Sequence, residues 1–281
     1  GLTKVNYLGT IDEWVKIDFK NSYSNPTSYA KDLYINDELL TDVKITSADS
    51  IKDYAFYNCQ SIKSVEIGKS VRYVGNSAFY SCPLTYLTIG QEVTEIGNYA
   101  FIGNKLEFIE IPDKVETIGG CALLGGNVKS IKLGKSVKEM GPSTYDKSGM
   151  SPLYAPSYIW SLSEIIVSPE NKVFSSYDGV LYDKNRTTLI TCPPAKTECI
   201  IPEGVEVIGE DSFRENYNLK CLTIPISVTS IGRGAFYVCN GLTSVTIPNS
   251  VTFIGSGAFR ACENLKTVYN CSSLDIVKGS T

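Results

Sequence analysis

The 281-residue sequence has no histidine, no Cys-x-x-Cys pair and no glycine-rich phosphate loop after a predicted strand. Without histidine the usual catalytic triads and the usual proton shuttle at neutral pH are excluded. Without histidine and Cys-x-x-Cys the sequence has no common zinc-ligand pattern. Without a glycine-rich phosphate loop it does not indicate nucleotide binding. The sequence therefore predicts a protein that is not an enzyme and that has no metal site and no cofactor.

Two further features are missing, namely a long apolar run and an excess of basic residues. No apolar segment approaches the roughly 18–20 residues of a membrane span, so we expect no membrane insertion of this chain. The net charge is −4 with a pI of about 5.1, and Lys and Arg are scattered, which gives no electrostatic case for nucleic acid. No signal peptide is present, and we expect both ends to be cuts in a longer protein.

A nine-residue phrase close to Val-x-x-Ile-Gly-x-x-Ala-Phe recurs at a fixed period. Its clearest copies are Val71–Phe79, Val93–Phe101, Val228–Phe236 and Val251–Phe259. Phe79 and Phe101 are 22 residues apart, and Phe236 and Phe259 are 23 apart. A period of this size predicts a solenoid in which the Phe side chains stack about 4.7–4.9 Å apart. Phe101→Ala is then expected to cost about 3–5 kcal/mol.

A second phrase, Leu-x-x-Leu-x-Ile, lies between the copies of the first. Its copies begin at Ile62, Leu84, Leu106, Val128, Leu162, Leu219, Leu242 and Leu265. Its last two apolar positions are two residues apart, which is the strand period, and a Gly or Pro usually follows. We expect one strand per coil, about eight coils, and a second Gly at another corner.

Read together over Val228–Pro248, with Cys239 and Leu242, the two phrases resemble the BspA-like leucine-rich repeat. The resemblance covers roughly residues 40–281. It implies a secreted or cell-surface protein of gut or mucosal bacteria, or of parasitic protists, that adheres to host matrix or to other cells. The implied partner is an extracellular host or microbial protein or glycan. The oligomeric state stays open.

The expected fold is an α/β, β-rich repeat solenoid: a right-handed, curved leucine-rich-repeat stack with a parallel sheet on one face and hairpin insertions. We assign residues 1–44 to an N-terminal capping or insertion segment. Within it, Thr10 is expected to cap a short helix, and Trp14 either covers the first coil or forms an exposed aromatic platform. Residues 45–281 form the solenoid, interrupted at about 146–160 and 170–199.

The second interruption reads as a hairpin. Val180–Tyr182 and Thr188–Ile190 bracket Asp183–Arg186, a pattern typical of two antiparallel strands. We expect it to leave the stack and return near Ile200. Asp183-x-Asn185 resembles the start of a calcium loop, but the required Gly and Glu are missing.

Nine cysteines raise the question of disulfides. The position three residues after the repeat Phe holds Cys59, Cys82, Cys239 and Cys262, with Asn104 and Asn216 in two other coils. The exchange of Cys for Asn favours free, buried thiols at a turn where a small polar group bonds to the backbone. Cys192 and Cys199 flank a Pro-rich turn and are the best disulfide candidates.

The first candidate binding site lies on the outer face of the predicted sheet. Tyr86 and Phe108 occupy consecutive coils beside Glu66 and Glu110, and strand alternation directs all four outward. Such a group suits a sugar or a peptide. The alternative is ordinary surface, which always contains some apolar residues.

The second candidate is the Ser-, Pro- and Tyr-rich segment from Asp146 to Trp160. Tyr154, Tyr158 and Trp160 are suited to anchor a partner, or else they pad the edge of the solenoid. The sequence thus favours a non-catalytic recognition or adhesion module at the cell surface, with a structural spacer that projects other domains as the alternative.

Overall fold

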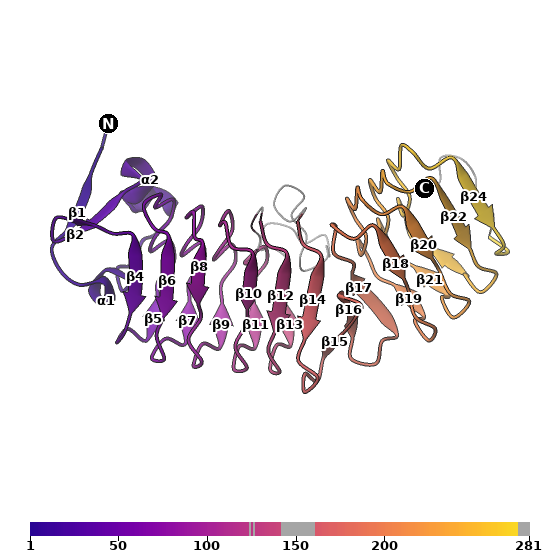
Figure 1. The fold of residues 1–281 in the computed structure, drawn as a ribbon, viewed down its shortest axis with the longest axis horizontal. Helices are drawn as coiled ribbons and strands as arrows, with labels where there is room; N and C mark the ends of the chain where they lie inside the picture. Colours follow the sequence, from indigo (N-terminus) through magenta and orange to yellow (C-terminus); the bar gives the residue numbers. More distant parts are fainter. Residues whose placement is uncertain (124, 126, 142–160, 275–281) are drawn as a thin grey trace.

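The computed structural model describes residues 1–123, 125, 127–141 and 161–274, which form an elongated stack of about nine coils (Figure 1). The predicted β-rich solenoid is confirmed, with one coil more than the eight expected. Helix is confined to three short segments of the described chain: α1 (Ile11–Trp14), the 3₁₀ turn η1 (Ser22–Ser24) and α2 (Thr27–Ala30). No helix in these described ranges is long and apolar enough to cross a membrane.

The Leu-x-x-Leu-x-Ile phrases form the first ladder of parallel strands. Its strands are β4 (Asp42–Ile45), β6 (Ser64–Ile67), β8 (Tyr86–Thr88), β10 (Phe108–Glu110), β12 (Ser130–Leu133), β14 (Glu164–Val167), β18 (Glu198–Ile200), β20 (Cys221–Thr223), β22 (Ser244–Ile247) and β24 (Thr267–Asn270). The predicted alternation is confirmed: in β6 Val65 and Ile67 are buried whereas Glu66 is exposed. Hydrogen bonding divides this ladder into the groups β4-β6-β8, β10-β12-β14, β18-β20 and β22-β24.

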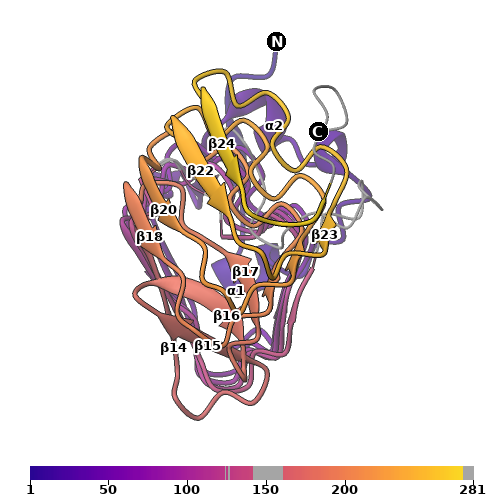
Figure 2. The same ribbon diagram turned by 90° about the vertical axis from the view of Figure 1, so that its right-hand side faces the viewer.

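A second ladder runs along the opposite flank, so the expectation of one strand per coil is wrong. Its strands are the residue pairs β5 (Ser50–Ile51), β7 (Tyr73–Val74), β9 (Glu95–Ile96), β11 (Thr117–Ile118), β13 (Glu139–Met140), β19 (Val207–Ile208), β21 (Ser230–Ile231) and β23 (Phe253–Ile254), and in all but β5 the second Gly of the repeat follows directly. The following Gly permits the close approach of coils, because a Cβ on Gly97 would lie 2.6 Å from the Asn76 nitrogen. Figure 2 looks along the stack and shows the two ladders on opposite flanks.

The Ala-Phe turns form the third side of the stack and direct the Phe side chains into the core. Phe79 stacks on Phe56 with ring centroids 5.1 Å apart, and on Phe101 at 5.4 Å. Phe236 continues the pattern near the other end, at 4.9 Å from Phe213 and 5.0 Å from Phe259. The predicted Phe ladder is therefore confirmed in both halves of the solenoid.

The Cys or Asn three residues after the Phe bonds to backbone, as predicted. The Cys82 thiol donates to the Phe56 carbonyl oxygen at 3.0 Å, and the Cys239 thiol donates to the Phe213 oxygen at 2.9 Å. Asn104 accepts from the Leu106 N–H at 2.8 Å. Burial raises the pKa of both thiols well above the ordinary value, so they stay protonated donors at neutral pH.

The N-terminal segment covers the first coil. Thr10 and Glu13 form a capping box at the start of α1, as the sequence predicted for Thr10. Trp14 is only 3% exposed and donates its indole N–H to the Ala55 oxygen at 2.8 Å, so the covering role is confirmed and the exposed platform is wrong. Next to it, β1 (Val5–Tyr7), β2 (Leu33–Ile35) and β3 (Glu38–Leu39) make a small separate sheet.

The predicted hairpin exists, but it stays inside the stack instead of leaving it. It consists of β15 (Phe174–Tyr177), β16 (Val180–Asp183) and β17 (Thr188–Thr191). The β16 strand pairs antiparallel with both β15 and β17, and β17 also pairs in parallel with β19. The Ile165 N–H of β14 bonds to the Gly179 oxygen at 2.8 Å. The hairpin thus joins the two halves, and the coils after it stand at a different tilt (Figure 1).

Candidate functional site

The predicted sheet-face residues stand on strands β6, β8 and β10. Tyr86 is 54% exposed and Phe108 is 47% exposed. Tyr86 lies opposite Ser64, and Phe108 lies opposite Ser130. Small neighbours cannot cover a ring across a strand pair, so both aromatic side chains remain open to solvent. The Thr88 hydroxyl donates to the Tyr86 oxygen at 3.0 Å and orients that phenol.

The two carboxylates of this face are each held by a lysine of a neighbouring coil. Glu66 lies 3.3 Å from the Lys44 ammonium, and Glu110 lies 2.7 Å from the Lys132 ammonium. Glu110 raises the pKa of Lys132 through this hydrogen bond. Sequence reasoning missed both lysines, although each stands one repeat away at the equivalent position. Exposed pairs like these contribute little to stability, so their main effect is to fix side-chain positions.

The structure does not bring Glu66 and Glu110 into one site. Their strands, β6 and β10, are two coils apart, with β8 between them in the chain of strands. Each carboxylate instead faces its own lysine on an exposed surface. Among the described residues, no group of three or more His, Cys, Asp or Glu is placed to hold a metal ion. We define the sheet face as Tyr86, Phe108, Glu66 and Glu110, a surface suited to contact rather than to paired acid and base chemistry.

The remaining predicted site residues, Tyr154, Tyr158 and Trp160, lie outside the described residues, as does the predicted insertion at 146–160. Their role stays a prediction. The structure also exposes apolar residues that the sequence reading did not name, among them Ile200 on β18, which is 68% exposed. Strand alternation could have identified it, because Glu198 and Ile200 are exposed on either side of the buried Cys199.

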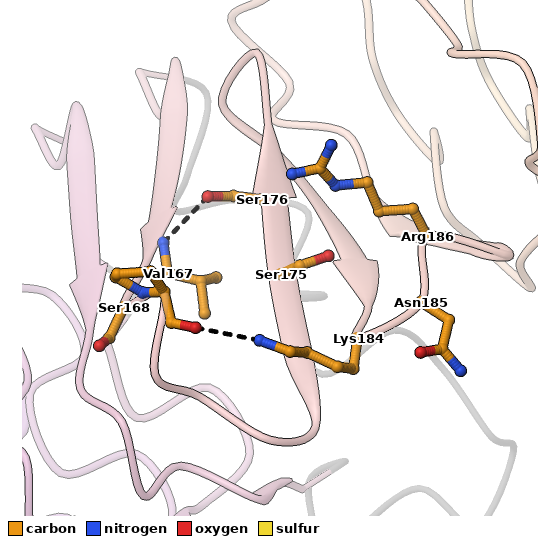
Figure 3. Close-up of a pocket in the computed structure, with 8 residues that line it drawn as sticks. Val167, Ser168, Ser175, Ser176, Lys184, Asn185 and Arg186 are labelled. Atoms are coloured by element: carbon orange, nitrogen blue, oxygen red, sulfur yellow. Dashed lines mark hydrogen bonds between the residues drawn. The ribbon is translucent and has the colours of Figure 1, made fainter.

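A depression of about 470 Å³ lies beside the hairpin, between the end of β14 and the β16–β17 turn (Figure 3). Lys184 and Arg186 supply its two positive charges, and no carboxylate lines it. The Lys184 ammonium donates to the Pro169 oxygen at 3.1 Å, and the Ser176 hydroxyl accepts from the Val167 N–H at 3.0 Å. This depression suits an acidic group on a partner better than a basic one.

Asp183, which the sequence placed at the start of a calcium-like pattern, has a local structural role. Its carboxylate accepts from the Thr187 hydroxyl at 2.7 Å and from the Thr188 N–H at 2.8 Å. Both bonds close the β16–β17 turn. The oxygens are directed to the backbone of the hairpin and so stabilise its tip.

The family model of the BspA type leucine-rich repeat region matches this chain in six copies, over residues 27–151 and 192–281. A leucine-rich repeat protein from Eubacterium ventriosum has a similar structure, with a TM-score of 0.73 and 30% identity over 92% of this chain and 65% of that one. This chain thus spans less than two thirds of that protein's structure.

The pneumococcal vaccine antigen PcpA shares the fold, with a TM-score of 0.54 and 22% identity over 85% of this chain and 70% of that one. No curated protein matches the chain. The repeat phrases, the Phe ladder and the six matched copies agree. The chain belongs to the BspA-type leucine-rich-repeat family.

Proposed function

We propose that this protein is a non-catalytic recognition module that acts outside the cell or at its surface and binds an extracellular protein or glycan, as in adhesion to host matrix or to other cells. The observation that carries the proposal is the sheet face, where Tyr86 and Phe108 stand uncovered on consecutive coils. Exposed aromatic side chains on a rigid scaffold are typical anchors of binding surfaces.

The charges around the two rings fit the same role. Lys44 and Lys132 hold Glu66 and Glu110 beside the aromatic pair, so a partner meets fixed charges of both signs. Fixed complementary charge favours specificity and register more than affinity. The extracellular location rests on family membership, because the family resemblance implies secreted or surface proteins.

The alternative is a spacer that projects other domains from the cell. An extended repeat stack serves that purpose without any ligand. It differs from a recognition module in one respect: its exposed aromatic residues have no partner. A binding assay with the isolated chain therefore separates the two functions.

The test is a screen of the chain against immobilised fibronectin, fibrinogen, collagen, mucin and a glycan panel. The double variant Tyr86→Ala/Phe108→Ala is compared with Phe253→Ala, a matched control because Phe253 is a 56% exposed aromatic residue on the opposite ladder. We expect saturable binding that the double variant weakens at least tenfold and the control leaves unchanged. The absence of binding to the whole panel would favour the spacer.

A further inference from the structure

A second concave surface lies on the third side of the stack, where the turns of the first three coils meet η1. It is an open hollow of about 510 Å³, within the range of roughly 300–1,000 Å³ that is usual for small-molecule sites. Its rim carries four tyrosines, and Asn76 and Asn98 lie between them. We call this surface the tyrosine groove and define it by Tyr54, Tyr57, Tyr80, Tyr99, Asn76 and Asn98.

The four tyrosines occupy two fixed positions of the repeat. Tyr54 and Tyr99 stand two residues before the repeat Phe, and Tyr57 and Tyr80 stand one residue after it. At the first of these positions the last two coils have Gly234 and Gly257, and at the second the last coil has Arg260. The cluster of phenols is thus a feature of the first three coils and is not required by the repeat.

Tyr54 and Tyr99 have a backbone conformation that is unfavourable for residues with a side chain. Tyr54 has a φ of +61° and Tyr99 a φ of +58°, in the left-handed region that disfavours residues with a Cβ. Gly234 and Gly257 adopt φ values of +59° and +65° at the same position and avoid this strain. Ser77, Cys121 and Asp211 hold the same repeat position at φ values of +52°, +57° and +51°, so the left-handed backbone belongs to this turn in most coils, and tyrosine is one of several side chains that the turn presents.

The rings and the amides form one ordered wall. Tyr57 and Tyr80 stack with centroids 4.7 Å apart, and Tyr54 meets Tyr57 edge-on at 6.0 Å. Asn98 accepts from the Gly120 N–H at 2.7 Å, and Asn76 accepts from the Asn98 N–H at 2.8 Å. A ligand therefore meets a preformed surface and loses little affinity to reorganisation.

Every side chain that lines the groove is uncharged. The carboxylate of Asp53, the residue before Tyr54, accepts from the Asn76 N–H at 2.8 Å and from the Tyr73 hydroxyl at 3.2 Å. The asparagine amides are engaged within the stack, because the Asn76 Nδ2 donates to Asp53 at 3.0 Å and the Asn98 Nδ2 donates to the Asn76 Oδ1 at 3.2 Å. Phenols both donate and accept hydrogen bonds, and aromatic rings add apolar contact area. That combination matches a ligand with many hydroxyl groups, apolar C–H faces and no charge.

We propose that the tyrosine groove binds an uncharged saccharide. This site lies on the turn side of the first three coils, whereas the sheet face lies on the first ladder, so the two sites are tested separately. The groove takes a sugar, and the sheet face remains available for a larger partner.

Titration of the full chain with uncharged and with sialylated or sulfated oligosaccharides tests the proposal. The informative variants are Tyr54→Gly and Tyr99→Gly, because glycine removes the ring and also tolerates the positive φ, so the fold is expected to survive. Tyr237→Ala is the matched control, since Tyr237 stands at the repeat position of Tyr57 and Tyr80 but near the other end of the stack. Melting curves verify that each variant is folded.

We expect an uncharged saccharide to bind, each glycine variant to weaken it at least tenfold, and Tyr237→Ala to leave it unchanged. Failure of every uncharged saccharide to bind, or binding retained in both folded glycine variants, would overturn the proposal. So would a requirement for a charged sugar. Saccharide binding that is lost in Tyr86→Ala/Phe108→Ala and kept in the glycine variants would move the sugar site to the sheet face.

Discussion

Replacement of Phe101 by Ala tests the core on which all other arguments rest. The Phe101 ring is fully buried and stacks on Phe79 at an interplanar angle of 6°. On its other side the next coil places Leu123, which is 1% exposed, at the same repeat position. Removal of the ring leaves a cavity between two coils whose spacing is fixed by backbone hydrogen bonds. We therefore expect a loss of about 3–5 kcal/mol, which includes about 0.5–1.5 kcal/mol of ring stacking.

The stability lost on removal of a Phe ring depends on the position of that Phe in the ladder. Phe259 ends the ladder in the described chain, is 9% exposed and stacks on Phe236. Because coils stabilise each other through nearest neighbours, Phe259→Ala is expected to cost about 1 kcal/mol less than Phe101→Ala. Urea unfolding followed by circular dichroism measures both. Hydrogen exchange should show the Phe101 variant losing protection first in the coils next to it.

Two results would refute this reasoning. A loss below about 1.5 kcal/mol for Phe101→Ala would mean that the coils collapse around the cavity, contrary to a rigidly spaced ladder. A uniform loss of protection along the whole stack would mean that the solenoid unfolds as one unit and is not a nearest-neighbour array.

Three further predictions concern the glycines and cysteines. Gly97→Ala should destabilise the protein by about 1–3 kcal/mol, because its Cβ would lie 2.6 Å from a backbone nitrogen. Gly141→Ala is the control and should be tolerated, because the atom nearest to its Cβ would be 3.7 Å away. Equal urea midpoints for the two variants would contradict this prediction. Iodoacetamide should label the exposed Cys221 and not the buried Cys82 in the folded protein, as peptide mass spectrometry measures. Burial raises the pKa of Cys82 in the folded state, so its contribution to stability is fully present below the unfolded-state pKa of about 8.5 and should fall by up to about 1.4 kcal/mol per pH unit above it. Urea unfolding under reducing conditions at pH 8 and pH 10 checks this, and a Cys82→Ala variant should show a smaller decline.

The sequence predicted those parts of the fold that depend on residues repeated in every coil. The Phe ladder, the outward alternation of the first strands and the Cys or Asn position were all readable, because each is a buried or half-buried slot that tolerates few side chains. The second ladder was missed because its strands are two residues long, as in Glu95–Ile96. Two residues show no periodicity, and only the stacking of coils makes them strands.

The position of the hairpin in the stack could not be predicted from the sequence. Its strands were readable from Val180–Tyr182 and Thr188–Ile190, but its place in the stack was not. That place depends on the pairing of β17 with β19, through Thr188 with Val207 and Leu189 with Ile208. The paired residues are 19 positions apart, which departs from the 22- or 23-residue period, so the repeat pattern does not specify this pairing.

The ion pairs of the sheet face were readable in principle. Lys44 and Glu66, like Glu110 and Lys132, are 22 residues apart, so the repeat period itself predicts that they meet. The tyrosine groove was not readable in this way. It depends on which side chains of neighbouring coils line one hollow, and the sequence pattern alone marks the position of Tyr54 and Tyr99 only as variable.

The repeat separates stability from recognition. The repeat Phe side chains and most apolar strand positions of the described coils are buried, whereas the outward strand positions are partly or fully open. The turn positions vary: Tyr54 and Tyr99 are partly open, whereas Ser77 is buried. Substitutions at the open positions change the surface with little effect on the core, since surface changes are usually within about 0.5 kcal/mol. Tyr86 and Ser64 occupy one such position. A scaffold of this kind can carry two unrelated binding surfaces on different sides, because neither surface uses a residue that the stack needs for folding.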